Sequence, residues 1–254
     1  MLLPDAIRSR LTPEFLLSLK LEQKIELLEL LEEREQVLKE TKLFQLYPDT
    51  GPLRRELYPK HLKFFKAGAD PDNMERACIA ANRVGKTWGI GGYETALHLT
   101  GLYPEWWEGR RFSHPIEAWA AGDTSETTRD IVQHALMGAI GELGTGLIPA
   151  EHIVGDPTRR QGVSGAMDTA RVRHVPSGGV SLLGFKSYDQ GRRKFQGTAK
   201  HVIWDDEEPP EDVYDEQLLR LMTVNGIMIG TFTPLMGLSK IVLRFMPEFA
   251  SSLG

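Results

Sequence analysis

A short apolar run that turns into Gly-Lys-Thr constrains this chain more than any other stretch. Residues 77–81 are small or apolar, and Ala80–Thr87 fits the phosphate-loop pattern, with Ala80 in place of the usual first glycine. An apolar strand feeding a tight loop, whose lysine and threonine open a helix, aims backbone N–H groups and a positive dipole end at a phosphate. The pattern predicts an α/β nucleotide-binding domain; a chance Gly-Lys-Thr in a loop is the plain alternative.

The spacing within this loop gives each residue a place at the nucleotide. Lys86 would reach the β- and γ-phosphates, and Thr87 would ligate Mg²⁺. The other members of the pattern would line the phosphates and complete the nucleotide-binding set, which is Ala80, Ala81, Asn82, Arg83, Val84, Gly85, Lys86 and Thr87.

A second informative stretch, His201–Pro210, is an apolar strand that delivers four carboxylates and then two prolines. Its carboxyl end belongs to the rim where α/β sheets bind ligands. In a phosphate-loop enzyme one Asp holds Mg²⁺ and the following Glu polarises the attacking water. Asp206 and Glu207 fit these roles best. Asp205 is the alternative metal residue, because the position at which the strand ends decides between the two.

The third stretch, Gly226–Pro234, is another strand of the buried type, and it ends in two hydroxyl residues and a proline. If it lies beside the acidic strand, Thr231 or Thr233 could sense the γ-phosphate and pass its loss to a moving part. Threonine is also simply a good strand former, so the interpretation depends on the order of the stretches along the chain.

Basic and aromatic residues precede the phosphate loop over residues 54–68. Tyr58 and His61 are candidates for holding an adenine ring by stacking and edge contacts, whereas the two neighbouring phenylalanines are at least as consistent with core packing. Further along, the patterns predict a strand over 116–122, a helix from 123 to about 140, and an antiparallel hairpin formed by 171–175 and 180–185.

The N-terminal residues 14–42 repeat leucines at helical spacing among many Glu and Lys residues. The pattern predicts a helix or helical hairpin with one buried stripe, packed on the edge of the domain. No heptad persists long enough to favour a coiled coil. We therefore divide the chain into a helical N-terminal extension or lid over 1–52 and a phosphate-loop ATPase core over 53–254.

Composition excludes several classes of protein. The 254 residues are 41% apolar and 26% charged, with a formal net charge of −5. These values are ordinary for a globular protein, and they leave any contact with nucleic acid to local basic patches. The single cysteine, Cys78, cannot form an internal disulfide and indicates a reducing compartment. No signal sequence or membrane-length apolar run is visible, so we expect a cytoplasmic protein without membrane contact.

The three stretches, in this order, resemble the ATPase domain of the large terminase subunit of tailed bacteriophages, the motor that packages double-stranded DNA into a prohead. Ala80–Thr87 is similar to the family's phosphate loop, Ile203–Pro210 to its acidic motif, and Thr231–Pro234 to its coupling motif. The tripeptide Phe195-Gln196-Gly197 adds to the likeness. The resemblance covers most of the chain, from Tyr58 to Leu243.

This resemblance implies a RecA-like α/β core of the ASCE type, a mostly parallel sheet flanked by helices. A strand would be inserted between the phosphate-loop strand and the acidic strand. ATP and Mg²⁺ would be bound by Lys86 and Thr87, and Arg83 would act near the γ-phosphate. Asp206 would hold the metal, and Glu207 would be the catalytic base.

The same resemblance implies how ATP hydrolysis is coupled to movement and which partners the protein binds. Thr231 and Thr233 would couple ATP hydrolysis to movement. The protein would assemble as a homo-oligomeric ring in the host cytoplasm, with double-stranded DNA, the small terminase subunit and the portal protein as partners. A ring needs a neighbour's arginine to complete each site. Arg129 and the basic stretch Arg192–Lys194 are candidates by charge and position.

Other interpretations stay open. Family members normally continue into a ribonuclease-H-like nuclease domain, which we expect to be absent from this chain, through truncation or because it lies on another chain. A superfamily-two-like helicase or translocase shares the three motifs but needs a second RecA-like domain. A metal-dependent nuclease would use the carboxylates of residues 205–208. A module that binds nucleotide without hydrolysing it is disfavoured by Glu207.

Overall fold

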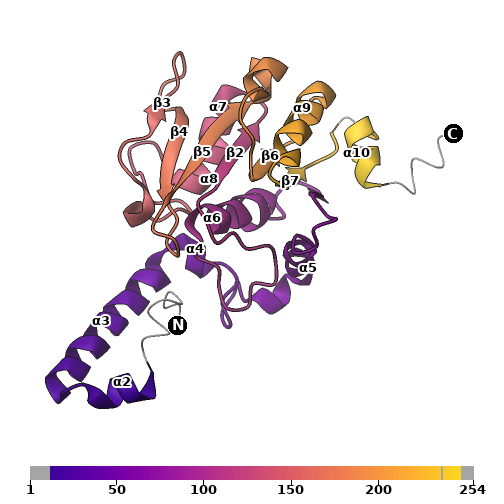
Figure 1. Cartoon of the computed structure of the whole chain (residues 1–254). Helices are drawn as coiled ribbons and strands as arrows, with labels where there is room; N and C mark the ends of the chain where they lie inside the picture. Colours follow the sequence, from indigo (N-terminus) through magenta and orange to yellow (C-terminus); the bar gives the residue numbers. More distant parts are fainter. Residues whose placement is uncertain (1–11, 236, 247–254) are drawn as a thin grey trace.

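A mixed sheet of seven strands, in the order β1-β7-β6-β2-β5-β4-β3, forms the centre of the structure (Figure 1). The computed structural model describes residues 12–235 and 237–246. In chain order the strands are β1 (Glu75–Ile79), β2 (Glu117–Gly122), β3 (Thr158–Arg159), β4 (Met167–Arg173), β5 (Val180–Ser187), β6 (Val202–Asp206) and β7 (Ile227–Phe232). The first five strands in the sheet order are parallel, and β4 and β3 add antiparallel pairs at one edge. The mostly parallel sheet confirms the predicted fold class.

The position of β7 decides how the functional stretches meet. It lies between β1 and β6, so the strand that ends in the two threonines separates the phosphate-loop strand from the acidic strand. This order confirms the inserted strand that the resemblance implied. Every residue of β6 and β7 is buried, because parallel strands in the middle of such a sheet are covered on both faces. The predicted hairpin is also confirmed, as the antiparallel pair β4 and β5.

Helices cover both faces of the sheet and lead into it from the N-terminal side (Figure 1). They are α2 (Pro13–Ser18), α3 (Leu21–Glu40), α4 (Lys42–Gln45), α5 (Pro59–Ala67), α6 (Tyr93–Thr100), α7 (Ser125–Thr127), α8 (His134–Met137), α9 (Glu211–Met222) and α10 (Lys240–Phe245). π-Helical turns precede α6 at Lys86–Gly92 and join α7 to α8 at Thr128–Gln133, which confirms the helix predicted after β2. Over the residues described, no helix is both long enough and apolar enough to cross a bilayer.

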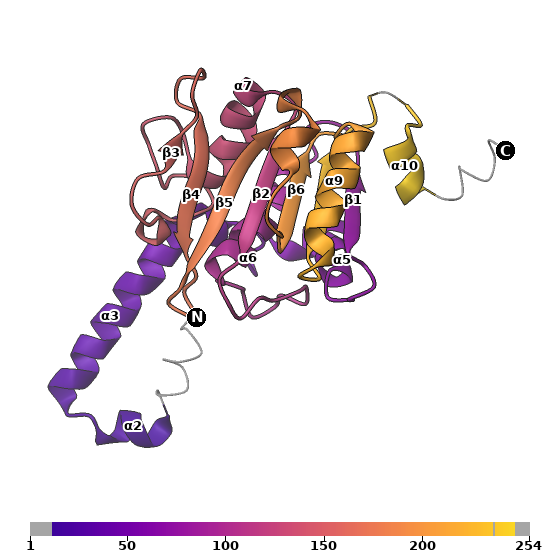
Figure 2. The same ribbon diagram turned by 45° about the horizontal axis from the view of Figure 1, so that its top comes forward.

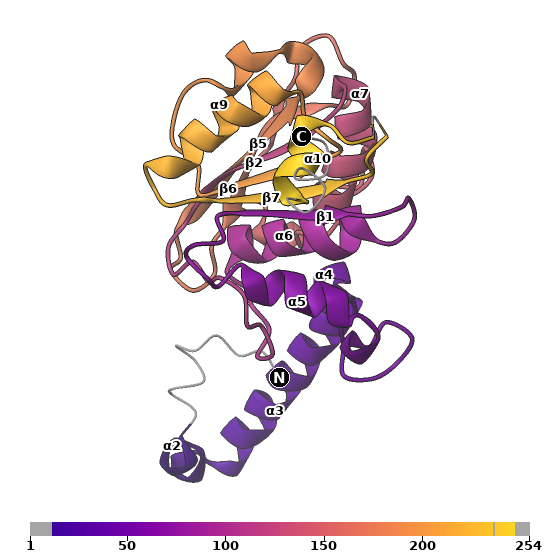
Figure 3. The same ribbon diagram turned by 90° about the vertical axis from the view of Figure 1, so that its right-hand side faces the viewer.

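Alternation along β6 divides its side chains between the two faces of the sheet. Trp204 packs in the cluster formed with the helical turns after the phosphate loop, whereas Ile203 packs in the cluster formed with α9. Figures 2 and 3 show α6 and α9 on opposite sides of the sheet. Asp206 therefore belongs to the face of Trp204 and of the phosphate loop, and Asp205 belongs to the face of α9.

The N-terminal helices α2 and α3 project away from the sheet (Figure 1). The prediction of a leucine stripe packed on the domain edge was wrong, because Leu21, Ile25 and Leu28 are exposed. The chain first enters the core at Leu43 and Tyr47, which are buried. The predicted division into 1–52 and 53–254 stays a prediction, and its residues 1–11, 236 and 247–254 lie outside the described residues.

A buried ion pair joins α5, β1 and α6 beneath the phosphate loop. The guanidinium of Arg76 donates to both carboxylate oxygens of Glu94 at 2.7 and 3.2 Å, and also to the backbone C=O of Phe64 at 2.8 Å. One turn further along α6, His98 Nε2 lies 3.2 Å from Glu94 Oε1. Although burial alone would raise the pKa of Glu94, Arg76 and His98 hold it below its usual value. The helix that follows the loop is thereby fixed to the strand that precedes it.

We expect Glu94→Gln to lower the free energy of unfolding by about 3 kcal/mol, because it leaves the charge of Arg76 buried without its partner. Urea denaturation at pH 7 measures this loss, with Glu22→Gln on the exposed surface of α3 as the control. The lowered pKa of Glu94 means that its stabilisation is present at neutral pH and is lost as the pH falls through that pKa. The difference between the wild type and the variant should therefore shrink on acidification; a difference that grows would contradict the argument.

Candidate active site

The phosphate-loop residues connect β1 to the π-helical turns Lys86–Gly92. Gly85 has φ +85°, in the left-handed region that glycine enters without steric cost. Its C=O accepts the N–H of Gly89 at 2.7 Å, which starts the helical hydrogen bonding. Arg83 also has a left-handed backbone, with φ +64°, a conformation that costs an L-residue about 1–2 kcal/mol. Residues 81–85 are exposed, so the loop lies at the surface, at the carboxyl end of β1.

Lys86 is buried under this loop. Its Nζ donates to the backbone C=O groups of Ala80 and Ala81 and to Thr233 Oγ1, each at 2.8 Å. Thr233 Oγ1 also lies 2.8 Å from Asn82 Oδ1. The lysine predicted to bind phosphate and the second threonine of the coupling stretch are therefore in direct contact.

Thr87 and Asp206 face each other across the gap between the loop and β6. Thr87 Oγ1 donates to the carboxylate of Asp206 at 2.9 Å. Thr231 Oγ1 donates to the same carboxylate at 2.8 Å and accepts from Trp204 Nε1 at 2.7 Å. Burial raises the pKa of Asp206 to about 6, against the opposing effect of the two hydroxyl donors. A chain of side-chain hydrogen bonds thus links both predicted motif strands to the phosphate loop.

Asp205, the alternative metal residue, points away from this chain of hydrogen bonds. It is buried on the α9 face, where Gln217 Nε2 donates to its Oδ1 at 2.7 Å. Burial raises the pKa of Asp205 to about 7. Because neighbouring strand residues face opposite ways, only one of the two aspartates can reach Thr87, and the register of β6 brings Asp206 there.

Glu207 follows β6 with a left-handed backbone, at φ +83°. Its N–H donates to the C=O of Thr231 at 3.2 Å, and its C=O accepts from the hydroxyl of Tyr188 at 2.9 Å. A pocket of about 590 Å³ opens beside it, lined among others by Asp123, Glu207, Glu208, Glu211, Thr233 and Lys240. The pocket is therefore lined by several carboxylates and reaches Thr233, the threonine predicted to couple hydrolysis to movement.

The oxygen ligands available between the phosphate loop and β6 fit Mg²⁺. They are the hydroxyl of Thr87 and the carboxylate of Asp206, and this buried carboxylate would gain from a cation because burial raises its pKa. Mg²⁺ binds through one or two protein oxygens and completes its shell with water and phosphate oxygens. Within residues 12–235 and 237–246 no three His, Cys, Asp or Glu side chains group as a metal site. The two oxygen ligands suit an ion that arrives with a nucleotide, whose phosphate oxygens and water complete the shell.

Tyr58 and His61, the candidates for the adenine, lie together with ring centroids 5.3 Å apart. Tyr47, which the sequence analysis missed, connects them to the loop: its hydroxyl donates to the C=O of Gly89 at 2.5 Å and lies 2.6 Å from His61 Nδ1. A Cβ added at Gly85 would lie 3.9 Å from His61 Cε1. The pair therefore borders the phosphate loop, and its contact with an adenine stays a prediction.

The candidate arginines make different contacts. Arg129 donates to the carboxylate of Asp130 at 2.7 and 2.9 Å and to the C=O of Ser164 at 3.0 Å. Arg192 pairs with Glu216 at 3.0 Å, whereas Arg193 and Lys194 are exposed and have no side-chain partner within the described residues. The basic stretch is thus freer to meet a neighbouring molecule than Arg129.

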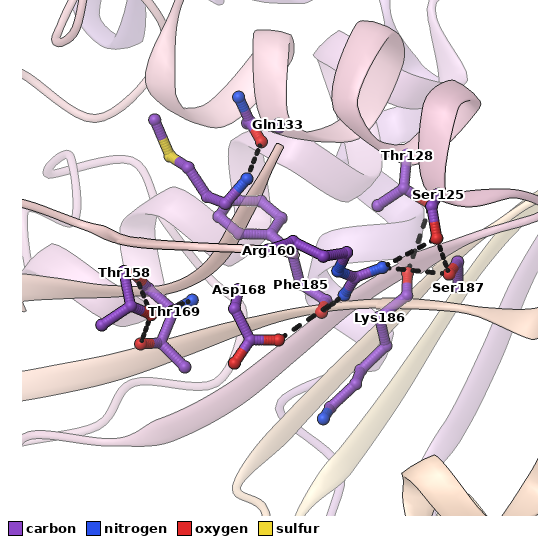
Figure 4. A network of polar contacts seen from close by, with 11 residues as sticks. Ser125, Thr128, Gln133, Thr158, Arg160, Asp168, Thr169, Phe185, Lys186 and Ser187 are labelled. Carbon is purple, nitrogen blue, oxygen red and sulfur yellow. Dashed lines mark hydrogen bonds and ion pairs between the residues drawn. The ribbon is translucent and has the colours of Figure 1, made fainter. Parts of the chain in front are cut away.

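A polar network fixes the carboxyl ends of β2 and β5 beside the site (Figure 4). Arg160 donates to the hydroxyls of Ser125 and Ser187, both at 3.1 Å, and these two hydroxyls lie 2.9 Å apart. Arg160 also contacts the C=O of Phe185. The N–H of Ser125 donates to Asp189 Oδ2 at 3.2 Å. The segment that carries Tyr188 is therefore anchored on both sides of that residue.

A mostly parallel sheet, with a Gly-Lys-Thr loop at its carboxyl edge whose threonine donates to Asp206, defines a phosphate-loop α/β protein. The chain belongs to the family of terminase large subunits: the model of "Terminase large subunit, T4likevirus-type, N-terminal" matches residues 77–252.

Known proteins similar to the chain come from phages. It is 37% identical over 250 residues to the large terminase subunit of Salmonella phage P22, a match that covers 91% of this chain and 48% of the relative. The chain thus spans about half the length of this relative. Two crystal forms of the large terminase from a thermophilic bacteriophage, one in complex with ADP, give TM-scores of 0.47 and 0.48. They are 12% identical and cover 76% of this chain and 49% of the other.

The two adjacent aspartates provide a matched test of the metal site. We expect Asp206→Asn to raise the Mg²⁺ concentration needed for half-maximal ATP binding more than tenfold, because one of two protein oxygens is weakened. Asp205→Asn should leave it nearly unchanged, because its side chain faces α9 and the amide can still accept from Gln217. Fluorescent ATP titrated at several Mg²⁺ concentrations measures both. An equal loss in the two variants would show that the register of β6 does not decide the ligand.

Proposed function

We propose that this chain is the ATP-hydrolysing motor domain of a phage terminase large subunit, which powers the translocation of double-stranded DNA into a prohead. The convergence of Lys86, Thr87, Asp206 and Thr233 at the carboxyl edge of β1, β6 and β7 supports this proposal most directly. Membership of the terminase family favours the motor over a superfamily-two-like helicase.

In the proposed reaction the phosphate loop binds ATP through its backbone N–H groups and Lys86. The lysine exchanges the C=O groups of the loop for the β- and γ-phosphate oxygens, and Arg83 lies near the γ-phosphate. Thr87 and Asp206 hold Mg²⁺, which neutralises charge on the phosphates when it is bound. Glu207 accepts a proton from the water that attacks the γ-phosphorus in line, and ADP and phosphate leave.

Coupling to movement follows from the contact between Lys86 and Thr233. With ATP bound, the lysine turns to the γ-phosphate; after phosphate release it returns to Thr233 at the end of β7. The chain continues from there to Ser239, which caps α10 and contacts the carboxylate of Glu208. A change at the γ-phosphate is thus transmitted to the segment that leaves the core. Thr231 donates to the carboxylate of Asp206, so it would respond to the presence of Mg²⁺ at that carboxylate.

The proposed motor needs partners. In a homo-oligomeric ring, Arg129 or the stretch Arg192–Lys194 would complete the site of the adjacent copy, whose acidic pocket beside Glu207 suits a cation. Tyr58 and His61 would hold the adenine. Double-stranded DNA, the small terminase subunit and the portal protein would be the other partners.

Steady-state ATP hydrolysis with two variants tests the proposed chemistry. We expect Glu207→Gln to lower kcat about 100-fold or more while ATP still binds, because it removes the proton acceptor only. Lys86→Ala should abolish both binding and hydrolysis, because the phosphate charge loses its buried partner. Normal hydrolysis by Glu207→Gln would rule out Glu207 as the base. Loss of ATP binding in that variant would mean that Glu207 has a structural role.

The dependence of hydrolysis on protein concentration tests whether neighbours complete the site. We expect the rate to rise faster than linearly with concentration, and to become linear and low in the variant that lacks the neighbour's arginine. Arg129→Ala and Arg193→Ala are compared, with Arg171→Ala on the exposed surface of β4 as the control. Unchanged rates at every concentration would exclude the residue concerned. A rate strictly proportional to protein in the wild type would indicate a self-sufficient site.

A further inference from the structure

We infer that Tyr188 is a positioning residue for Glu207. The hydroxyl of Tyr188 donates to the backbone C=O of Glu207 at 2.9 Å. The inference rests on the proposed function, in which Glu207 is the catalytic base. Tyr188 belongs to none of the three motif stretches. It lies directly after β5, 19 residues before the residue that it contacts.

Glu207 needs such support because of its backbone. At φ +83° it is a non-glycine residue in the left-handed region. Residues held in such sparsely populated regions are strained and persist only when their surroundings fix them. The two prolines at 209 and 210 restrict the chain on its far side. Two hydrogen bonds hold the residue itself: its N–H donates to the C=O of Thr231 at 3.2 Å, and its C=O accepts from Tyr188 at 2.9 Å. The bond from Tyr188 is the shorter.

Tyr188 is itself held rigidly. It is 5% exposed, and its ring lies 6.3 Å from that of Phe195. On one side Ser187 bonds to Arg160 and Ser125 (Figure 4). On the other side Asp189 accepts the N–H of Ser125. These contacts tie Tyr188 to the ends of β2 and β5. Its hydrogen bond to Glu207 therefore holds the loop after β6 in place relative to those strands.

The chemistry of the hydroxyl suits a permanent donor. Burial, and after it the neighbouring carboxylates of Asp205 and Asp206, keep the pKa of Tyr188 well above its ordinary value. The raised pKa favours the protonated hydroxyl, the form that donates. It donates to a backbone C=O, so it can fix where the chain of Glu207 lies without taking part in proton transfer.

The position of Glu207 matters because a general base must lie within hydrogen-bond distance of the attacking water. A displacement of about 1 Å can cost about 100-fold in rate. Without the hydroxyl of Tyr188, the backbone of Glu207 keeps only its bond to Thr231, and the carboxylate samples positions out of reach of the water. ATP binding by Lys86 and Thr87 involves none of these contacts. Loss of the Tyr188 hydroxyl should therefore lower kcat and leave the KM for ATP unchanged.

Tyr188→Phe, in the whole chain, tests the inference, because it removes the hydroxyl and keeps the ring that packs on Phe195. In steady-state hydrolysis with duplex DNA present, we expect kcat to fall about tenfold while the KM for ATP stays unchanged. Tyr214→Phe is the matched control: this tyrosine is also buried, and its hydroxyl donates to Glu75 at 2.6 Å. Thermal unfolding compares the stability of the two variants. The control should keep the wild-type kcat, and a fall in both variants would overturn the inference.

A double-mutant cycle separates positioning from general damage. If Tyr188 acts through Glu207, Tyr188→Phe has no further effect on the slow single-turnover hydrolysis of Glu207→Gln. The same fold-loss in both backgrounds would overturn the inference. So would a wild-type kcat for Tyr188→Phe beside an inactive Glu207→Gln, although the proposed function would then stand. Wild-type hydrolysis by Glu207→Gln would overturn the proposed base and the inference together.

Discussion

The contact between Thr87 and Asp206 is the one on which the rest of the site depends. It requires the carboxyl end of β6 to face the first helical turn after the phosphate loop at hydrogen-bond distance. That approach is possible because the turn is rich in glycine: a Cβ at Gly91 would lie 2.0 Å from Trp204 Nε1. The indole fills this space and donates to Thr231, which in turn donates to Asp206. The packing of Trp204 against the glycine-rich turn and the hydrogen bonds to Asp206 therefore both fix the distance between β6 and that turn.

The insertion of β7 between β1 and β6 explains why Thr231 and Thr233 contact both the phosphate loop and the acidic strand. Because β7 pairs with β1 on one side and with β6 on the other, its carboxyl end lies between the lysine of the loop and the aspartate of the acidic strand. The period of two along the strand places Thr231 and Thr233 on the same face. One threonine meets Asp206 and the other meets Lys86. A strand in any other position in the sheet would reach at most one of these groups.

The sequence was sufficient for the fold class and for placing the loop between β1 and the helical turns that follow, because both depend on local patterns: apolar runs, a Gly-Lys-Thr turn and carboxylates after a strand. It favoured Asp206 but kept Asp205 as an alternative, since only the register of β6 shows which one faces the loop. Tyr47 and Tyr188 could not be predicted, because their partners are 42 and 19 residues away and no motif marks either tyrosine. The leucines of α3 were misjudged for a related reason. Helical periodicity shows that a helix forms, but not whether the same chain offers a surface to cover it.

The loop after β6 is the point at which these long-range contacts meet. Tyr188 holds the backbone of Glu207 from β5, and the side chain of Glu208 contacts Ser239 at the start of α10. The two adjacent glutamates are thus tied to different elements, Glu207 to the segment after β5 and Glu208 to the start of α10. Glu207 is also bonded through its N–H to Thr231 of β7, so a shift of β7 would reach both glutamates. The loop after β6 thus connects the end of β5, the end of β7 and the start of α10.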